Sequence, residues 1–252
     1  MRSILIKTLA MFATVLFLGL VAAQAATLTV DNTADSGPGT LRQALTDATF
    51  NAEANDILFN IPTTDPGYDS GTNRFTILLT SELPSIPVAA TTITNAQPQA
   101  VTITGNGQIR IFTLDNGAAV LMNNITISNG YSGPLLAPNK TMSRARSAKL
   151  VAIGESYGGG IYMGSSSTLT LNAVVISNNV ATFLGGGIYM SGDATLHAHY
   201  SSMTGNSANH GGAIFMENGG TLNIDTSTLN GNIASGDGGA GGGAVYVGWT
   251  ST

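Results

Sequence analysis

The sequence predicts an all-β protein, a parallel β-helix, and three segments that recur in its second half are the reason. Gly-Gly-Gly-Ile-Tyr-Met occupies residues 158–163 and 185–190, and close variants occupy residues 211–216 and 242–247. Thr-Leu pairs begin a second segment at Thr168, Thr195 and Thr221, and Asn-containing blocks follow at residues 176–181, 203–208 and 229–234. A fixed period of about 26 residues is typical of a solenoid.

Residues 1–25 are predicted to be a secretory signal peptide. Arg2 and Lys7 accompany an apolar run over residues 9–21, and Ala23-Gln24-Ala25 is a small-x-small cleavage site. The run is shorter than the roughly 20 residues of a membrane-spanning helix, which favours cleavage after Ala25 over an uncleaved anchor. We therefore expect an exported protein, extracellular or at the outer-membrane surface, and peripheral to a membrane at most.

Residues 26–62 are expected to form a first strand and a short capping helix. Thr40 and Gln43 have the spacing of a capping box. The apolar side chains that follow share one helical face: Leu41, Ala44, Leu45 and Ala48. A helix placed here would cover the first rung, because the open edge of a solenoid otherwise recruits other chains.

Residues 63–252 are expected to form the rungs, with three short strands in each period. The segments alternate apolar and polar side chains and are separated by Gly, Asn and Ser. Because side chains alternate across a strand, two inward columns are predicted: Ile161, Ile188, Ile214 and Val245, and Met163, Met190, Met216 and Val247. A β-sandwich is the alternative, but it does not require the same Asn and Gly at the same phase of each period.

A column of asparagines is predicted at one corner of the coil. Asn179, Asn206 and Asn232 share a phase, and Asn106 and Asn129 are assigned to the same column. Stacked inward amides can bond the rungs above and below them, and Asn also tolerates the left-handed conformation of turns. The glycine runs are interpreted as turns with positive φ rather than as phosphate-binding loops.

Two places break the period. Residues 131–157 hold Lys140, Arg144, Arg146 and Lys149, and are interpreted as an irregular surface insertion, with a basic binding loop as the alternative. The sequence reaches Thr252 soon after a further rung begins. The chain is therefore expected to be a fragment of a longer protein, or to have a last rung that associates edge to edge with another copy.

The residues also carry a family resemblance. Residues 35–45, Asp-Ser-Gly-Pro-Gly-Thr-Leu-Arg-Gln-Ala-Leu, resemble the opening segment of bacterial secreted and surface β-helix proteins. The Gly-Gly-Ala/Gly-Ile repeats are similar to those of polymorphic outer-membrane proteins. The resemblance covers nearly all of the chain after residue 25 and implies a right-handed, pectate-lyase-like β-helix displayed at the cell surface. It implies a fold more than an activity, because this scaffold carries adhesins and polysaccharide enzymes alike.

Two outward columns are candidate binding surfaces. One is aromatic: Tyr162, Tyr189, Phe215 and Tyr246. Its rings are expected to stack between rungs, and a flat aromatic strip also suits a sugar ring or a partner surface, so this column is the preferred one. The other is polar: Asn172, His199 and Asp225, beside Thr170, His197 and Asn223. A His–Asp stack with His210 nearby would suit a metal or a proton transfer, although polar ladders are the normal outside of a β-helix.

Composition argues against several other functions. The formal charge of −5 disfavours nucleic-acid binding, and the absence of cysteine removes disulfides and thiol chemistry. The carboxylates are scattered along the sequence, so no catalytic residue, metal or cofactor is predicted. The sequence therefore favours a structural or adhesive protein that binds glycans or host or cell-surface molecules. The alternative is a polysaccharide lyase or glycoside hydrolase, which would need clustered carboxylates with Lys, Arg or calcium.

Overall fold

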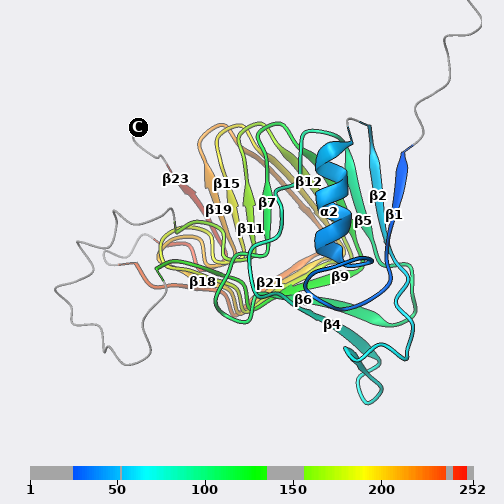
Figure 1. Ribbon diagram of the computed structural model, residues 1–252. Coiled ribbons are helices and arrows are strands. Elements are labelled where there is room, and N and C mark those ends of the chain that lie inside the picture. The colour runs from blue at the N-terminus through cyan, green and yellow to red at the C-terminus, as the bar shows by residue number, and fades with distance from the viewer. Residues whose placement is uncertain (1–24, 52, 135–155, 237–240, 249–252) are drawn as a thin grey trace, which may run out of the picture.

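The protein is an all-β parallel solenoid with one short helix near its N-terminal end, as the sequence predicts (Figure 1). The computed structural model describes residues 25–51, 53–134, 156–236 and 241–248. Strands from successive windings lie beside one another and form four sheets along the coil. Each sheet therefore collects one strand from each of several windings.

Two of the sheets have seven strands each. Sheet A contains β1 (Ala26–Val30), β2 (Asn55–Phe59), β5 (Thr91–Thr94), β8 (Ala119–Asn123), β12 (Thr168–Asn172), β16 (Thr195–His199) and β20 (Thr221–Asp225). Sheet B contains β3 (Tyr68–Asp69), β4 (Arg74–Leu78), β6 (Ala100–Thr104), β9 (Ile125–Ser128), β13 (Val175–Ser177), β17 (Ser202–Thr204) and β21 (Thr228–Asn230). The pair β3–β4 is antiparallel, whereas the neighbouring pairs in both sheets are parallel.

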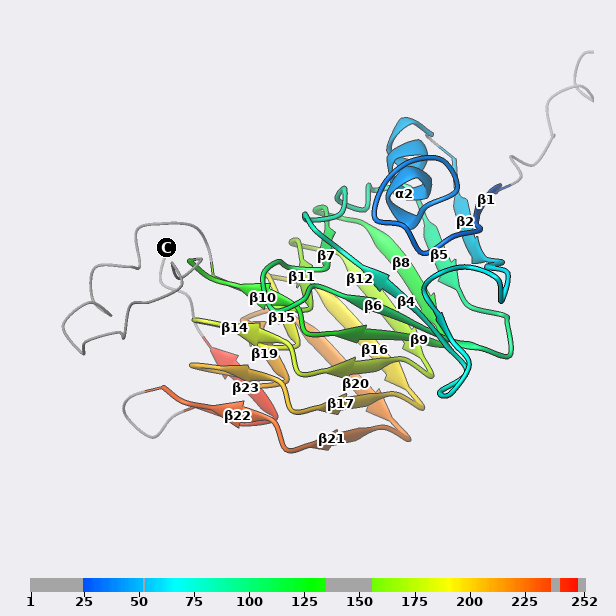
Figure 2. The same ribbon diagram turned by 60° about the horizontal axis from the view of Figure 1, so that its bottom comes forward.

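Two narrower sheets complete each winding. Sheet C contains β7 (Phe112–Leu114), β11 (Ile161–Met163), β15 (Ile188–Met190), β19 (Ile214–Glu217) and β23 (Val245–Gly248). Sheet D contains β10 (Tyr131–Ser132), β14 (Val180–Ala181), β18 (Ser207–Ala208) and β22 (Ile233–Ala234). From β11 onward the chain visits sheets C, A, B and D in turn, and Figure 2 shows these windings following one another along the coil.

From β11 onward each winding contains four strands rather than the three predicted, and the additional strand belongs to sheet D. Residues 176–181 read as one segment in the sequence, but the backbone turns at Asn178, whose φ is 54°. A positive φ ends an extended strand, so residues 176–177 belong to β13 and Val180 begins β14 in a new direction. Gly205 (φ 64°) and Gly231 (φ 62°) make the same turn in the next two windings.

The asparagine column directly follows this turn, and it is confirmed for three residues. Asn179 Nδ2 donates to Asn206 Oδ1 at 3.0 Å, and Asn206 Nδ2 donates to Asn232 Oδ1 at 2.9 Å. The same two oxygens also accept from the backbone N–H groups of Asn179 and Asn206. Asn179 and Asn206 are fully buried, so the ladder satisfies polar groups that water cannot reach.

Two residues assigned to this column do not belong to it. Gly130 occupies the place before Asn179, and its N–H donates to Asn179 Oδ1 at 2.7 Å. Asn129 (φ 52°) is instead the turn residue equivalent to Asn178, because Ser128 pairs with Ser177. Asn106 (φ 54°) is an exposed turn residue. The prediction was wrong here because the turn and the ladder occupy adjacent positions that both accept Asn.

The two predicted apolar columns are present in register. Ile161, Ile188, Ile214 and Val245 pair in sequence along sheet C, as do Met163, Met190, Met216 and Val247. Five members of the two columns are fully buried: Ile161, Ile188, Ile214, Met163 and Met190. Val247, in the last described winding, is 60% exposed. Each rung therefore covers the apolar face of the one before it, as nearest-neighbour stability requires.

The repeated glycines serve two purposes rather than the one predicted. Gly158, Gly185 and Gly211 have φ values of 61°, 65° and 64°, and so make the expected turns. The glycine that follows each of them is needed because neighbouring windings come close. A Cβ on Gly186 would lie 2.4 Å from the carbonyl oxygen of Ser207, a distance that no side chain tolerates.

The predicted strand and helix at the N-terminal end are both present. The helix α2 (Leu41–Phe50) has Thr40 as its N-cap, whose side chain accepts from the N–H of Gln43. The reciprocal half of the capping box is absent, because Gln43 Nε2 donates to Asp47 instead. The predicted apolar face is buried against the first strands: Leu41, Ala44, Leu45 and Ala48.

An ion pair and the hydrogen bonds beside it hold α2 against the loop at residues 80–82. Arg42 Nη2 donates to Asp35 Oδ1 at 2.6 Å, and its guanidinium also donates to the carbonyls of Ser81 and Glu82. Thr80 Oγ1 donates to the other Asp35 oxygen at 2.6 Å. Burial acts to raise the pKa of the Asp35 carboxyl, but the bonds from Thr80 and Arg42 and the Arg42 charge outweigh burial and lower that pKa.

Some predictions concern residues that are not described. The signal peptide, apart from Ala25, lies outside the described residues, as do residues 135–155 of the predicted insertion, with their four basic residues, and the last four residues of the chain. The irregular insertion begins later and ends earlier than predicted. Tyr131–Ser132 is strand β10 of the coil, and Tyr157 forms a parallel bridge with Leu184.

Candidate functional site

The aromatic column runs along the outer side of sheet C, where the sequence places it. Ring centroids are 5.2 Å apart for Tyr162 and Tyr189, 5.7 Å for Tyr189 and Phe215, and 5.4 Å for Phe215 and Tyr246. The interplanar angles lie between 11° and 22°, so the rings are stacked. The stack arises because the four residues are in strand register, one in each winding.

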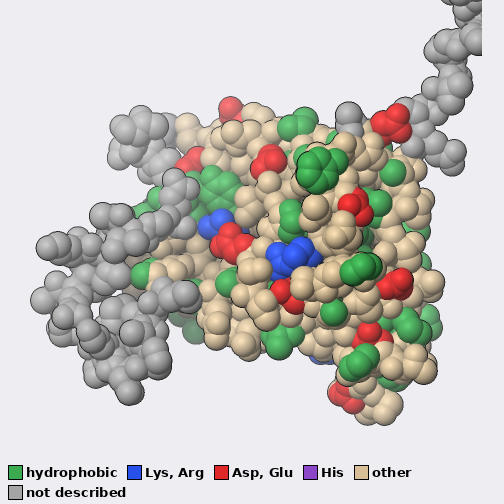
Figure 3. Space-filling model, in the orientation of Figure 1, with side chains coloured by type: hydrophobic (Ala, Val, Ile, Leu, Met, Phe, Trp, Pro, Cys, Tyr) green, Lys and Arg blue, Asp and Glu red, His purple; other side chains and the backbone are tan. Residues whose placement is uncertain are grey.

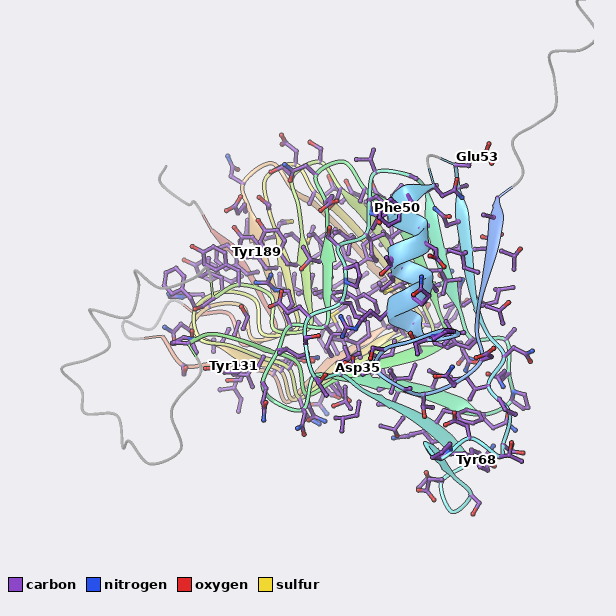
Figure 4. The ribbon with its side chains drawn as sticks, in the orientation of Figure 1. Asp35, Phe50, Glu53, Tyr68, Tyr131 and Tyr189 are labelled. Atoms are coloured by element: carbon purple, nitrogen blue, oxygen red, sulfur yellow. The ribbon has the colours of Figure 1, made fainter. Side chains whose placement is uncertain are left out.

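The column is not the exposed strip that was predicted. Tyr189 and Phe215 are each only 3% exposed, and they form a small apolar cluster with Leu184. Tyr157 stacks on Tyr189 at 4.7 Å, and it enters the cluster from the end of the predicted insertion. The sequence did not reveal this cover, because the residue just before the repeated Gly-Gly segment changes its type from winding to winding: Tyr157 pairs with Leu184, and Leu184 with His210. Figure 4 labels Tyr189 among the crowded side chains at this side of the coil.

Polar side chains contact the aromatic column at two places. The guanidinium of Arg110 lies 5.2 Å from the centre of the Tyr162 ring, a cation–π contact. Arg110 also donates to Ser132 Oγ and to the carbonyl of Tyr157, and so ties together the two ends of the insertion. The Tyr189 hydroxyl donates to Glu217.

Tyr189 is a buried hydrogen-bond donor rather than an acid. Burial raises the pKa of Tyr189, and the hydrogen bond to Glu217 and the charge of Glu217 raise that pKa further. Glu217 Oε2 also accepts from the N–H of Gly192 at 2.7 Å. The phenol and the carboxylate thus link two windings, and the faces of Tyr189 and Phe215 are occupied by neighbouring rings. The column stabilises the coil, and its outer members Tyr162 and Tyr246 are half-buried.

The polar column lies on the outer side of sheet A and is more accessible. Asn172, His199 and Asp225 are in register, and Thr170, His197 and Asn223 form a second line beside them. His199 Nδ1 lies 3.5 Å from Asp225 Oδ2, and Asn223 Nδ2 lies 3.2 Å from His197 Nδ1. Asp225 and Asn223 are exposed, and the two histidines and Asn172 are half-buried.

The polar column extends further than the sequence indicated. Asn172 Nδ2 donates to Asn123 Oδ1 at 3.0 Å, and Asn123 Nδ2 donates to Thr94 Oγ1 at 2.8 Å. Hydrogen-bonded side chains therefore join β5, β8 and β12, and strand register continues the same line through His199 to Asp225 on β20. Thr94 and Asn123 were missed because the repeats are recognisable only from residue 158 onward, and earlier windings keep the register without the motif.

His210 does not join the polar column. Its ring packs against Phe183 and Tyr246, at centroid distances of 6.3 Å and 5.2 Å, beside the aromatic column. His210 pairs with Leu184, which lies between β14 and β15, whereas His199 lies in sheet A. Within the described parts of the chain, no group of three or more His, Cys, Asp or Glu side chains could hold a metal ion.

The rest of the described surface carries few charged side chains. Figure 3 shows one face on which uncharged side chains predominate and a few acidic and basic groups are scattered.

No protein-family model matches the chain, and no curated protein matches it. The resemblance to polymorphic outer-membrane proteins therefore stays a prediction. None of the helices in the described residues is long and apolar enough to cross a membrane.

Proposed function

We propose that this protein is an exported, secreted or cell-surface β-helix with a structural and adhesive role, which binds a glycan or another surface molecule. The observation that carries the proposal is the polar column of sheet A. It presents amide, hydroxyl and imidazole groups in register from Thr94 to Asp225. Rungs are spaced about 4.8 Å apart, so the column offers a polymer many weak hydrogen bonds that act together.

Export is supported by the N-terminal pattern. The predicted cleavage after Ala25 falls directly before Ala26, the first residue of β1. Cleavage there would leave the first strand intact. Mass spectrometry of the mature protein should show Ala26 as its first residue. A mature protein that still begins at Met1 would contradict the predicted signal peptide.

The binding test compares two faces of the same winding. Replacing His197 and His199 by Ala removes two side chains from the polar column, and replacing Ser202 and Thr204 by Ala changes the outer face of β17 in the same winding as a control. We expect the histidine variant to lose at least tenfold in affinity on a glycan array and in cell attachment, whereas the control keeps wild-type binding. Equal binding by both variants would exclude the polar column.

The aromatic column needs a different test because of its burial. Tyr189→Ala would open a cavity costing about 3–5 kcal/mol, so lost binding in this variant would report lost folding. Tyr246→Ala and Tyr162→Ala change the half-buried outer rings and are the informative variants. If they, rather than the histidine variant, lose binding with the fold intact, the aromatic column is the binding surface.

The enzyme alternative has its own test. An acidic polysaccharide incubated with the purified protein, with and without calcium, should gain no new reducing or unsaturated ends if the role is adhesive. Release of such ends would instead establish a glycoside hydrolase or a lyase.

A further inference from the structure

Tyr200 holds a backbone conformation that suits it poorly. Its φ is 49°, in the left-handed region, which is rare for bulky side chains because the Cβ crowds the following carbonyl oxygen. Successive windings share a positive φ at this corner between sheets A and B: Asn124, Ala173, Tyr200 and Thr226. Since Asn adopts this conformation with less strain than other side chains, the turn itself does not require an aromatic residue.

Packing does not explain the tyrosine either. Tyr200 is 71% exposed, although the windings before and after it are both present. Ala173, in the winding before, ends at its Cβ and cannot cover a ring, and the hydroxyl of Thr226, in the winding after, donates to Asp225. A residue that strains the backbone and buries little of its ring is better explained by a ligand than by the fold.

The polar column of sheet A lies directly beside this residue. His199 precedes Tyr200 in the chain, and the N–H of Tyr200 donates to the carbonyl of Asp225 at 3.3 Å. His199 Nδ1 lies 3.5 Å from Asp225 Oδ2, and the second ring nitrogen of His199 donates or accepts according to the tautomer. An aromatic ring, an imidazole and a carboxylate therefore come from neighbouring positions at one corner of the coil.

The charge of this region indicates the class of ligand. Residues 156–236 contain no Lys or Arg, so apart from its histidines the region has no side chain that could neutralise an acidic sugar. A uronate or sulfate group would be repelled by Asp225. A neutral sugar avoids this repulsion, because its hydroxyls can donate to the carboxylate and its C–H face can lie against the electron-rich face of an aromatic ring.

We propose that Tyr200 is the stacking residue of a binding site for neutral hexose units, and that His199 and Asp225 bond to the hydroxyls of the same sugar. This inference rests on the proposed glycan-binding function and names its ligand class. A pyranose ring is comparable in size with a tyrosine ring, so a single unit can contact adjacent residues of this corner. Further units of a chain would follow the polar column through Asn172.

The first experiment identifies the ligand class on an oligosaccharide array. Its neutral members are built from glucose, galactose, mannose and N-acetylglucosamine, and its acidic members carry uronate or sulfate groups. The wild-type protein should bind neutral members in preference to acidic ones. In titration calorimetry with the tightest neutral oligosaccharide, Tyr200→Asn should lose about tenfold in affinity because the stacking contact is removed, whereas Tyr200→Phe should keep wild-type affinity.

Thermal stability gives a second readout. Asn occupies the equivalent position at Asn124, so Tyr200→Asn relieves backbone strain and should raise the thermal midpoint by about 2–4 °C. Weaker binding in a more stable protein would separate a role in binding from a role in folding. Phe50→Asn is the matched control, because Phe50 is an aromatic residue on α2 that is 86% exposed; this variant should bind like the wild type.

Failure of this inference and failure of the proposed function give different results. If Tyr200→Asn binds neutral glycans like the wild type while the histidine variant does not, the polar column binds without the ring and this inference is wrong. Preference for acidic members of the array would overturn the ligand class alone. Lost binding with a lower thermal midpoint would assign Tyr200 to the fold. A wild-type protein that binds no glycan would overturn both this inference and the glycan-binding function.

Discussion

Asn206 bonds through its side chain to the windings before and after its own. Its Nδ2 donates to the carbonyl of Ile176 and to Asn232 Oδ1, both at 2.9 Å, while its Oδ1 accepts two bonds from Asn179. All of these groups lie where water is excluded or nearly so. A short amide is well suited to this corner because it offers two donors and an acceptor in one plane.

We predict that Asn206→Ala lowers the free energy of unfolding by about 3 kcal/mol, because it leaves several buried groups without partners. Urea denaturation followed by circular dichroism measures the change. Asn230→Ala, at an exposed site on β21, should change the stability by less than about 0.5 kcal/mol. Equal effects of the two substitutions would mean that the amide ladder does not stabilise the coil.

Gly186 is restricted by its neighbours rather than by its own backbone. A Cβ there would lie 2.4 Å from the oxygen of Ser207 and 2.5 Å from that of Gly212. We predict that Gly186→Ala costs about 3 kcal/mol through forced separation of the windings, visible as a lower thermal midpoint. Gly192→Ala, whose nearest atom would be 3.7 Å away, is the control and should leave the midpoint nearly unchanged. A tolerated Gly186→Ala would show that the windings are farther apart than described.

At the scale of elements, α2 is held in place by the pair Asp35–Arg42. Because the folded-state pKa of Asp35 is lowered, the ionised carboxylate stabilises the fold at pH values above its ordinary pKa of about 3.9. That stabilisation is lost as the pH falls from there through the lower, folded-state pKa. Acid should therefore weaken the attachment of the helix.

We predict that Asp35→Asn destabilises the protein by about 1.5 kcal/mol at pH 7 and that the difference from wild type shrinks below pH 4. Urea denaturation at a series of pH values measures both. Asp47→Asn is a suitable control, because Asp47 is an exposed carboxylate on the same helix. A constant difference at all pH values would show that the ion pair does not hold the helix.

Some features of these elements were predictable from the sequence, and others were not. The columns of Ile188 and Met190 were predictable, because a period near 26 residues and strict alternation leave a single in-register arrangement. Sheet D was not, because a one-residue turn at Asn178 splits a segment whose letters look continuous. The stacked rings were predictable from their phase, but their burial was not, because Tyr157 and Leu184 cover them from outside the repeated motif.

For the whole molecule, the central claim is that equivalent side chains of successive windings lie directly over one another. The polar column of sheet A follows from the same register, which joins Thr94 to Asp225 although they are far apart in the sequence. The proposed binding surface depends on this register.

A single spin–spin distance tests that register most directly. Thr76 and Ser202 are linked through Thr102, Thr126 and Val175 along the outer side of sheet B, which makes four strand spacings. At about 4.8 Å for each spacing, their Cα atoms should lie about 19 Å apart. Cysteines at Thr76 and Ser202, spin-labelled and diluted with unlabelled protein, should give a narrow distribution near that distance in a pulsed dipolar measurement. A broad distribution, or one centred at about twice that distance, would contradict the stacked coil.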